Sequence, residues 1–340
     1  MPEVPEVTAI LVGTHEQPDV LARLIESLAQ QTLAPAEIVC VDQSPDGRFA
    51  PLARTAEPAV RMVGLRENLG YPSACNRGAA TARGEFLLFI NPDAQADAAC
   101  VETLADALCV RPDAAIAGAQ ILLPDGRVNA GDNALHMTGL SWAGRYGLSA
   151  EDGPPRPAAV VSGAALMVRR SMFEALGGYT EGFFMYYDDV DLAWRARLAG
   201  WEVLFCPHAR IAHDYEFQKG NYKWRYLERN RWWCLLTHLR ARTLLALAPL
   251  LLTVEAAICA RAAAEGWLGA KLGAWGLLWR DRRSLAARRR QLQRGRTIGD
   301  RPILERMSAA VDSPFIASLA LQRMAPLLRA YRSLVLKLTR

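Results

Sequence analysis

The sequence predicts an α/β fold with a mostly parallel central sheet, followed by a helical region. Over the first half of the 340 residues, short apolar runs alternate with amphipathic stretches of helical spacing. This alternation is typical of βαβ units, whose strands form a parallel sheet. After about residue 226 the remaining patterns are helical. Because 51% of the residues are hydrophobic and 22% are charged, the chain can bury a core and is unlike a disordered protein.

The strands are predicted from six apolar runs, four of them in the first 90 residues. These runs cover residues 7–12, 36–41, 61–65, 85–90, 160–168 and 201–206. Helices are predicted over 19–30, 71–82 and 189–199, where apolar residues recur at helical spacing. Gly200 follows the last of these helices, in the position where glycine commonly ends a helix. Residues 126–157 are rich in Gly, Pro and Asp and are predicted to form a loop-rich insertion.

The net charge of +5 is concentrated in one segment. Between Arg280 and Arg301, nine arginines accompany Asp281 and Asp300, a local balance of +7 that leaves −2 for the rest of the chain. Such a segment favours contact with an anionic surface. Nucleic acid is not expected as the partner, because no recognised nucleic-acid-binding motif accompanies the arginines.

The seven cysteines contain no CxxC pair. They therefore indicate neither a zinc site nor a disulfide framework, and we expect reduced thiols. The first residues, MPEVPEV, lack the basic and apolar regions of a signal peptide. Both features predict a cytoplasmic location for the main body of the protein.

Polar residues follow several of the predicted strands. Ligands of open α/β sheets bind at the carboxyl ends of the strands, where this chain has Thr14, Asp42 and the segment Asn91-Pro92-Asp93. Asp42 is suited to accept a hydrogen bond from a base, although aspartate also commonly initiates a turn. Asp93 offers the hard oxygen ligand that a divalent cation on a diphosphate needs. A simple strand-ending turn is the alternative for the same segment.

A third acidic group, Asp188, Asp189 and Asp191, opens the helix predicted over 189–199. The helix dipole stabilises acidic residues in the first turn, so a structural role accounts for them. The same position keeps a carboxylate ionised and fixed in direction, as a general base requires. The aromatic residues of 183–187 precede this group and fit either a sugar-facing wall or the core.

The order of these segments along the chain carries more information than any one of them. They are residues 68–71 (Asn-Leu-Gly-Tyr), 76–78 (Asn-Arg-Gly), 91–93 (Asn-Pro-Asp) and 184–192 (Phe-Met-Tyr-Tyr-Asp-Asp-Val-Asp-Leu). Together they resemble family 2 glycosyltransferases, particularly a bacterial rhamnosyltransferase-like branch. Residues 177–179, 195–201 and His213 also resemble the family pattern, and the resemblance covers roughly residues 7–235.

The resemblance implies a GT-A fold and assigns roles to the matching positions. Asp189 would be the catalytic base, with Asp188 where glutamate is usual. Asp93 would be the metal-binding acid, and His213 would complete the metal or diphosphate site. The implied nucleotide or donor contacts are Thr14, Asp42 (toward the base), Asn68, Gly70, Asn76, Arg77 and Asn91.

The chain departs from the family pattern in two places. Pro72 and Ser73 replace the small residues that usually follow the aromatic residue, and Asp214-Tyr215-Glu216 replaces the usual Gly/Ser-rich run after His213. The second departure leaves a structural role for His213 open.

The activity that the resemblance implies is inverting, metal-dependent hexosyl transfer, with rhamnose favoured. The donor would be a dTDP- or UDP-sugar, and the acceptor a hydroxyl of a lipid-linked or cell-envelope glycan. A Mg²⁺ or Mn²⁺ ion would offset charge on the leaving diphosphate while Asp189 takes the acceptor proton. The catalytic region is expected over 1–235, with a donor half of about 1–95 and an acceptor half of about 96–235.

Residues 236–340 are expected to form a helical, membrane-associated region. Pro249 is expected to break the uncharged run 244–254, which falls short of the ~20 apolar residues of a spanning helix. Residues 267–279 place Trp and Leu at helical spacing beside the arginines of 280–301. Tryptophans next to arginines favour a peripheral position on the anionic inner face of the plasma membrane. A helical subdomain packed on the catalytic region is the alternative.

Two other functions stay open on the sequence. A sugar nucleotidyltransferase would need a Gly-rich loop with Lys or Arg after the first strand, which residues 13–18 do not provide. A non-catalytic scaffold on a degenerate fold is disfavoured by the four acids named above, Asp42, Asp93, Asp188 and Asp189.

Overall fold

The computed structural model describes residues 5–55, 59–213, 220–313 and 319–339. The chain forms two compact units. The sheet unit takes its residues from 1–133, 143–196 and 201–215. The helical unit takes its residues from 134–142, 197–200 and 216–340. The predicted departure at 214–216 lies outside the described residues.

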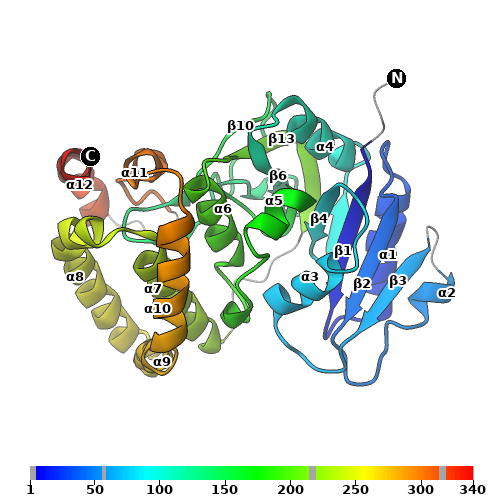
Figure 1. The fold of residues 1–340 in the computed structure, drawn as a ribbon, viewed down its shortest axis with the longest axis horizontal. Helices are drawn as coiled ribbons and strands as arrows, with labels where there is room; N and C mark the ends of the chain where they lie inside the picture. Colours follow the sequence, from blue (N-terminus) through cyan, green and yellow to red (C-terminus); the bar gives the residue numbers. More distant parts are fainter. Residues whose placement is uncertain (1–4, 56–58, 214–219, 314–318, 340) are drawn as a thin grey trace. The chain divides into compact units, whose positions relative to one another are not determined.

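The sheet unit is built on one mixed sheet (Figure 1). Its strands are β1 (Val7–Gly13), β2 (Glu37–Asp42), β3 (Val60–Gly64), β4 (Phe86–Ile90), β5 (Ala94–Ala96), β6 (Ala114–Leu122), β7 (Val128–Ala130), β10 (Arg156–Pro157), β12 (Ala165–Arg169) and β13 (Glu202–His213). The order is β10-β13-β6-β12-β4-β1-β2-β3, with β5 paired to β13 and β7 to β6. β4, β1, β2 and β3 run parallel, as do β6 and β13, while β12 lies antiparallel between β4 and β6. The predicted α/β class is confirmed.

Different helices cover the two faces of this sheet (Figure 1). The helical elements are α1 (Pro18–Ala29), α2 (Leu52–Thr55), α3 (Tyr71–Ala79), α4 (Cys100–Val110), α5 (Arg170–Ala175), the 3₁₀ turn η1 (Glu181–Phe183) and α6 (Asp188–Leu198). On one face, Leu11 of β1 joins a core with Leu24 of α1 and Leu104 of α4. On the other, a Cβ added to Gly78 of α3 would come within 2.7 Å of Ile10 Cγ2. Neighbouring residues of β1 therefore face opposite sides, as strand geometry requires.

The structure corrects several predicted boundaries. The single strand predicted over 160–168 is two strands, β11 (Val160–Val161) and β12, separated by a turn at Gly163. The strand predicted over 201–206 continues to His213 past an irregularity between Cys206 and Arg210. The insertion 126–157 contains β7, β8 (Asp132–Leu135), β9 (Ser141–Trp142) and β10. Neither the helix α4 nor the strand β6 was predicted. The strand was missed because it is rich in alanine, which has little preference for strands.

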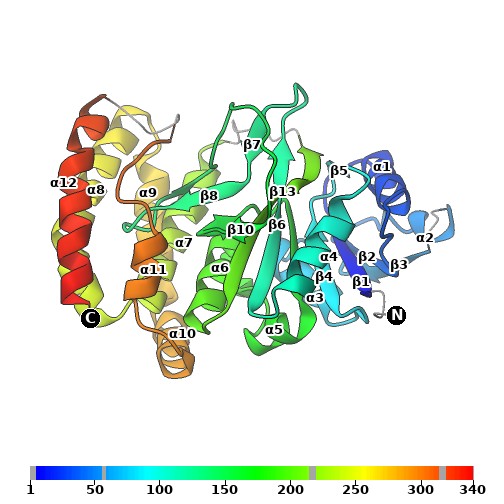
Figure 2. The ribbon, with the colours of Figure 1, turned by 90° about the horizontal axis from the view of Figure 1, so that it is seen from above.

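The helical unit consists mainly of α7 (Tyr222–His238), α8 (Ala241–Ala264), α9 (Leu268–Arg280), α10 (Arg282–Gly295), α11 (Arg301–Arg306) and α12 (Leu319–Leu338). α7 packs against α9 and α10, and α8 lies beside α12 (Figure 2). The Tyr331 hydroxyl of α12 donates a hydrogen bond to the Ala246 carbonyl of α8. The predicted helical C-terminal region is confirmed.

α8 runs unbroken through Pro249, so the interruption expected there is wrong. Within the described residues, it is the one helix that is long and apolar enough to cross a membrane, with 24 residues and a mean hydropathy of 2.0. Length and composition alone are weak evidence for a span, and a buried core helix meets the same criterion. Only 17% of its most apolar window is buried, so most of this apolar surface is uncovered.

Candidate active site

Asn91, Asp93 and His213 meet at the carboxyl end of β4. β5 begins one residue after Asp93 and pairs with the end of β13, where His213 lies opposite Ala94. His213 Nε2 lies 3.0 Å from Asp93 Oδ1 and 3.3 Å from Asn91 Nδ2. The histidine is 4% exposed, whereas the side chain of Asp93 is 49% exposed. The structure thus brings together a buried imidazole and an accessible carboxylate that are 120 residues apart in the chain.

The 3.0 Å separation is that of a hydrogen bond between the imidazole and the carboxylate, and it also matches the spacing of two cis ligands of one divalent cation. Two ligand atoms at right angles and ~2.1 Å from one ion lie about 3 Å apart. The Asp93 and His213 atoms are 3.0 Å apart. Carboxylate and imidazole groups together suit Mn²⁺ and related ions, and the carboxylate suits Mg²⁺. The residues therefore fit a cation, and a diphosphate would have to supply further oxygens.

Asp188 and Asp189 open α6, as predicted, and differ in exposure. Asp188 is 8% exposed, whereas Asp189 is only half-buried. Asp189 Oδ2 accepts a hydrogen bond from the Gly163 N–H at 3.0 Å, and Oδ1 accepts one from the Val190 N–H at 2.8 Å. Two backbone donors therefore fix the direction of the Asp189 carboxylate.

Burial changes the protonation of both carboxyl groups. It raises the pKa of Asp188 to about 8, and the neighbouring charge of Asp189 adds to the effect. Burial also raises the pKa of Asp189, although the hydrogen bonds from Gly163 and Val190 oppose the shift. With a pKa of about 8, Asp188 holds a proton near neutral pH, whereas the hydrogen bonds from two backbone N–H groups favour the ionised form of Asp189.

The turn between β11 and β12 connects the two groups of site residues. Gly163 donates its N–H to Asp189, and the next carbonyl, that of Ala164, accepts the N–H of Asn91 at 2.9 Å. A Cβ on Gly163 would lie 3.3 Å from the Asp189 Cβ, tighter than most such contacts. Gly163 was not predicted as a site residue, because it lies inside a segment that was predicted as one continuous strand.

The segment before the acidic pair has an unusual backbone. Phe184, Tyr186 and Tyr187 all have positive φ, between 61° and 65°. Such conformations are costly for bulky residues and concentrate at functional sites. The Phe184 carbonyl accepts the Tyr71 N–H at 2.9 Å, which ties this segment to the start of α3.

Gly70 makes that approach possible. Its φ is +86°, and an added Cβ would come within 2.4 Å of the Phe184 carbonyl oxygen. Asn68 shapes the same loop, since its Oδ1 accepts the Gly70 N–H at 2.9 Å. These two residues lie together, at the loop leading into α3.

Asn76 and Arg77 lie further along α3. Asn76 Nδ2 donates to the Tyr179 carbonyl at 2.9 Å and Oδ1 accepts the Tyr179 N–H at 2.8 Å, so its amide joins α3 to the loop before η1. Arg77 is exposed in the last turn of α3, which leads back toward the start of β4. The structure does not bring Arg77 to the carboxyl edge of the sheet.

Thr14 and Asp42 lie at the ends of β1 and β2. Asp42 is 3% exposed and accepts hydrogen bonds from the Ser44 N–H at 2.8 Å and from the Phe49 N–H at 3.4 Å. It therefore shapes its own loop, as the turn alternative expected. Gln43, which the sequence analysis passed over, donates to Thr14 Oγ1 at 3.2 Å and accepts the Leu69 N–H at 2.8 Å. This buried amide connects Thr14 to the loop of Asn68 and Gly70.

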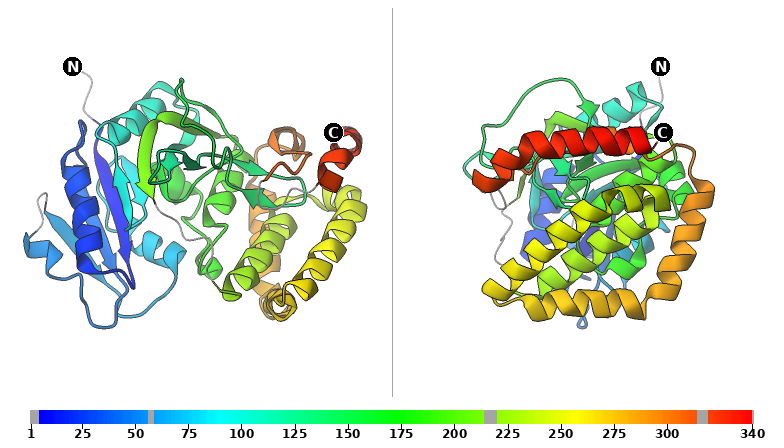
Figure 3. Two further views of the ribbon diagram at one scale, coloured as in Figure 1. Left: turned by 180° about the vertical axis from the view of Figure 1, so that it is seen from behind. Right: turned by 90° about the vertical axis from the view of Figure 1, so that its left-hand side faces the viewer.

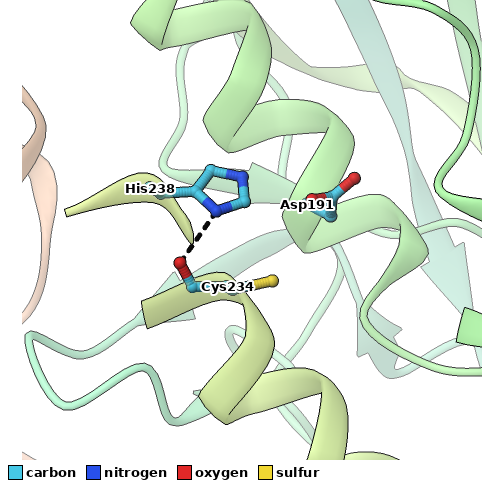
Figure 4. A group of neighbouring side chains, drawn as sticks. All are labelled: Asp191, Cys234 and His238. Atoms are coloured by element: carbon cyan, nitrogen blue, oxygen red, sulfur yellow. Dashed lines mark hydrogen bonds between the residues drawn. The ribbon is translucent and has the colours of Figure 1, made fainter. Parts of the chain in front are cut away.

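Three residues with metal-binding side chains lie outside this arrangement. Asp191, in the sheet unit, accepts hydrogen bonds from Thr180 Oγ1 at 2.9 Å and from Arg195 Nε at 2.8 Å. Cys234 and His238 lie one turn apart on α7, where His238 Nδ1 is 2.8 Å from the Cys234 carbonyl oxygen (Figure 4). Each of these hydrogen bonds lies within one unit, and no metal site is assigned to the three residues.

The chain is similar to bacterial proteins of glycan biosynthesis. It is 29% identical over 242 residues to an N-acetylglucosaminyl-diphospho-decaprenol L-rhamnosyltransferase of Mycobacterium tuberculosis, covering 63% of this chain and 78% of that protein. It is 30% identical over 219 residues to the O-antigen biosynthesis protein RfbC of Myxococcus xanthus, covering 60% of this chain and 17% of that protein.

The fold is shared with a solved glycosyltransferase. The crystal structure of GalNAc-T7 with UDP, GalNAc and Mn²⁺ superimposes with a TM-score of 0.59 at 15% identity, over 70% of this chain and 48% of that chain. This likeness identifies the GT-A fold expected from the sequence. Residues 9–177, about half of the chain, match the model of glycosyl transferase family 2. The chain therefore belongs to the family 2 glycosyltransferases.

Proposed function

We propose that this protein is an inverting, metal-dependent hexosyltransferase that transfers rhamnose from a dTDP-sugar, with UDP-sugars as the second choice of donor. The acceptor is a hydroxyl of a lipid-linked or cell-envelope glycan. The observation that carries the proposal is the 3.0 Å pair of Asp93 and His213, linked through the 163–164 turn to the oriented carboxylate of Asp189.

The proposed chemistry uses the residues according to their surroundings. Asp93 and His213 would hold a Mg²⁺ or Mn²⁺ ion together with the donor diphosphate, and the ion would offset negative charge on the leaving group. Asp189 accepts the proton of the acceptor hydroxyl as that oxygen attacks the anomeric carbon from the face opposite the leaving group. One displacement of this kind inverts the configuration and needs no covalent sugar–enzyme intermediate.

The donor is assigned to the loops at the carboxyl ends of β1 to β4. Thr14, Asn68 and Gly70 contact the nucleotide, and Asp42 shapes the loop on the side of the base through its hydrogen bonds to Ser44 and Phe49. Gln43 supports this arrangement because its amide joins Thr14 to the loop of Asn68. Asn91 positions His213, whereas Asn76 acts by holding the 178–181 loop in place. On this proposal residues 1–95 handle the donor and 96–235 the acceptor.

The relatives and the helical unit support the proposed acceptor and location. A relative named for N-acetylglucosaminyl-diphospho-decaprenol supports an acceptor sugar carried on a lipid diphosphate. Exposed apolar residues on α8 and the arginines of 280–301 support peripheral attachment of residues 236–340 to the inner face of the plasma membrane.

The test is release of nucleotide from a panel of sugar nucleotides by the purified full chain, with and without Mg²⁺ or Mn²⁺. We expect slow, metal-dependent hydrolysis of one donor, dTDP-rhamnose first. Asp93→Ala should abolish it, because the variant removes the exposed ligand of the pair. Asp106→Ala, an exposed acid on α4, is the matched control and should keep wild-type hydrolysis.

Two results would contradict the proposal. Donor binding without any turnover, even when a lipid-linked glycan acceptor is supplied, would indicate a scaffold. Metal-dependent formation of a sugar nucleotide from a sugar phosphate and a nucleoside triphosphate would indicate a nucleotidyltransferase.

A further inference from the structure

The helical unit contains a hollow of about 410 Å³ that the proposed active site does not use. Its apolar lining comes from Trp232, Leu236, Trp275, Leu278, Trp279 and Leu285. These residues belong to α7, α9 and α10, and Glu255 of α8 and Arg282 complete the wall. The volume is in the range of pockets that bind small ligands. Figure 3 (right) shows α8, α9 and α10 following one another around this part of the helical unit.

Two of the three tryptophans that line the hollow are open to solvent. Trp279 is 71% exposed and Trp275 is 38% exposed. On the same helix, Leu272 is 51% exposed, although it does not line the hollow. Large apolar side chains gathered at the surface mark sites of contact with an apolar ligand, a partner or a membrane.

Glu255 does not make the hollow anionic. Its carboxylate is paired with the buried side chains of Arg231 and Lys271. It also accepts the indole N–H groups of Trp232 at 3.0 Å and Trp275 at 3.1 Å. Burial opposes its ionisation, but the two cations more than offset this effect and lower the pKa of Glu255. Arg231 and Lys271 therefore neutralise the Glu255 carboxylate. Through its two hydrogen bonds, this carboxylate also fixes the indole rings of Trp232 and Trp275 in the lining of the hollow.

The uncompensated charge at the hollow is positive. The guanidinium of Arg282 lies 4.8 Å from the centre of the Trp279 ring, and its Nη1 donates to the Trp279 carbonyl at 2.9 Å. Arg282 is exposed, as is its neighbour Arg283. An apolar hollow with an arginine at its edge complements a hydrocarbon chain that carries an anionic head.

We propose that this hollow binds one isoprenoid chain with its phosphate head at Arg282. An open hollow of about 410 Å³ between helices has room for a single chain, whereas a bilayer surface would need only an exposed apolar face such as that of α8. The relative named for N-acetylglucosaminyl-diphospho-decaprenol favours an isoprenoid over other hydrocarbon chains. The assignment rests on the proposed function, in which the acceptor glycan is lipid-linked, and adds the place where the lipid is held.

The experiment measures binding of tritiated farnesyl monophosphate to the full chain by equilibrium dialysis. We expect saturable binding that weakens about tenfold or more in Trp279→Ala, in Arg282→Ala and in Leu278→Trp, which fills the hollow. Leu272→Ala removes a comparably exposed apolar side chain of α9 outside the hollow and should bind within about twofold of wild type. Farnesol should bind the wild type more weakly than farnesyl phosphate, and Arg282→Ala should remove that difference. Thermal unfolding of each variant checks that the helical unit is intact.

Several outcomes would overturn the assignment. One is equal binding by all four variants, or none by the wild type. Full displacement by inorganic phosphate, with no farnesol binding, would leave only an anion site on the arginines. Binding of phosphatidylglycerol vesicles with no binding of farnesyl phosphate would make the hollow part of a bilayer-contact surface. Donor hydrolysis measured on the same preparation separates these failures from a failure of the proposed function, because it needs no lipid.

Discussion

Asp188 and Asp189 are neighbours in sequence with different surroundings, and the difference predicts different effects of the same substitution. Asp189 is half-buried and held by two backbone N–H groups, while Asp188 is buried and its pKa is raised to about 8. Asparagine is a close mimic of a protonated aspartate but cannot accept a proton. We therefore expect Asp189→Asn to lower kcat for sugar transfer by about 10²–10⁴, the usual contribution of a general base. Asp188→Asn should retain activity within about tenfold.

Steady-state transfer rates with the donor found in the hydrolysis panel, at saturating acceptor, measure both variants. Donor binding serves as the control, since neither carboxylate is assigned to the nucleotide. Equal losses in the two variants would show that Asp188 acts as an ionised group and that its assignment as the neutral partner is wrong.

The raised pKa of Asp188 also predicts how stability depends on pH. Its carboxyl group binds its proton more tightly in the folded state, with a pKa of about 8 against 3.8 for an ordinary aspartate. The stabilisation that this proton provides is present below about pH 4 and is lost as the pH rises through about 8. The side chain at position 188 does not titrate in Asp188→Asn. The Tm of this variant minus the Tm of the wild type should therefore increase from pH 5 to pH 9. The gain should be at least about 2 °C, which corresponds to ~1 kcal/mol in a domain of a few hundred residues.

Differential scanning calorimetry across this pH range measures the difference between the two proteins. Asp106→Asn, at an exposed position of α4, is the matched substitution and should follow the wild type at every pH. If the difference in Tm between Asp188→Asn and the wild type does not change with pH, the pKa of the Asp188 carboxyl is not raised into this range.

At the scale of elements, the loop leading into α3 depends on one glycine. Gly70 and Gly47 both have positive φ, +86° and +66°. A Cβ added to Gly70 would collide with the backbone of Phe184, whereas a Cβ added to Gly47 would meet no atom within 4 Å. Gly47→Ala should lower the free energy of unfolding by only ~1–2 kcal/mol, which is the cost of placing a residue with a Cβ in the left-handed conformation. Gly70→Ala must also displace Phe184, whose carbonyl binds the N–H of Tyr71. We expect Gly70→Ala to be the more destabilising and to weaken donor binding, whereas Gly47→Ala leaves donor binding unchanged.

Isothermal titration with the nucleotide diphosphate of the donor, combined with urea unfolding, measures both effects. If Gly70→Ala binds the nucleotide as the wild type does, the approach of the 68–71 loop to Phe184 does not shape the donor site.

The elements that could be predicted were those with strong local patterns. β1, β2 and β4 are continuous apolar runs, and α1 and α6 show helical spacing next to start or stop signals. β6 was missed because five of its nine residues are Ala or Gly, which fill close-packed space in the sheet but give no β signal. Gly118 within it leaves no room for a Cβ beside Val161. The turn at Gly163 was missed because its role depends on a long-range contact with Asp189, which no local pattern records.

The candidate site shows the same limit. The order of motifs pointed to Asp93, His213 and Asp189, but the residues that orient them act through tertiary hydrogen bonds. Gln43 is an ordinary polar residue after a strand, and only the folded chain reveals that it bridges Thr14 and Leu69. Conversely, Arg77 matched a motif, yet it lies exposed at the end of α3 that leads away from the carboxyl edge. A linear motif fixes residue type and spacing, whereas burial and direction come from the fold.

At the scale of the whole molecule, the distribution of charge predicts where the protein is found. The segment from Arg280 to Arg301 carries +7 while the remainder of the chain carries −2. Binding to anionic vesicles should therefore be strong at low salt and weak near 1 M salt, where the Debye length falls from ~10 Å at 0.1 M to ~3 Å. The exposed arginines Arg283, Arg290 and Arg294 should account for much of it, because each can contribute about 1 kcal/mol near an anionic surface.

Co-sedimentation with phosphatidylglycerol and phosphatidylcholine vesicles measures this attraction. We expect the triple Arg→Gln variant at 283, 290 and 294 to bind the anionic vesicles at least about tenfold more weakly than the wild type. A matched triple variant at three exposed arginines of the sheet unit, Arg23, Arg54 and Arg83, changes the net charge by the same amount. Since those positions lie outside the basic segment, it should bind within about twofold of the wild type. Equal losses in the two triple variants would mean that net charge, and not the 280–301 segment, attracts the protein to the membrane surface.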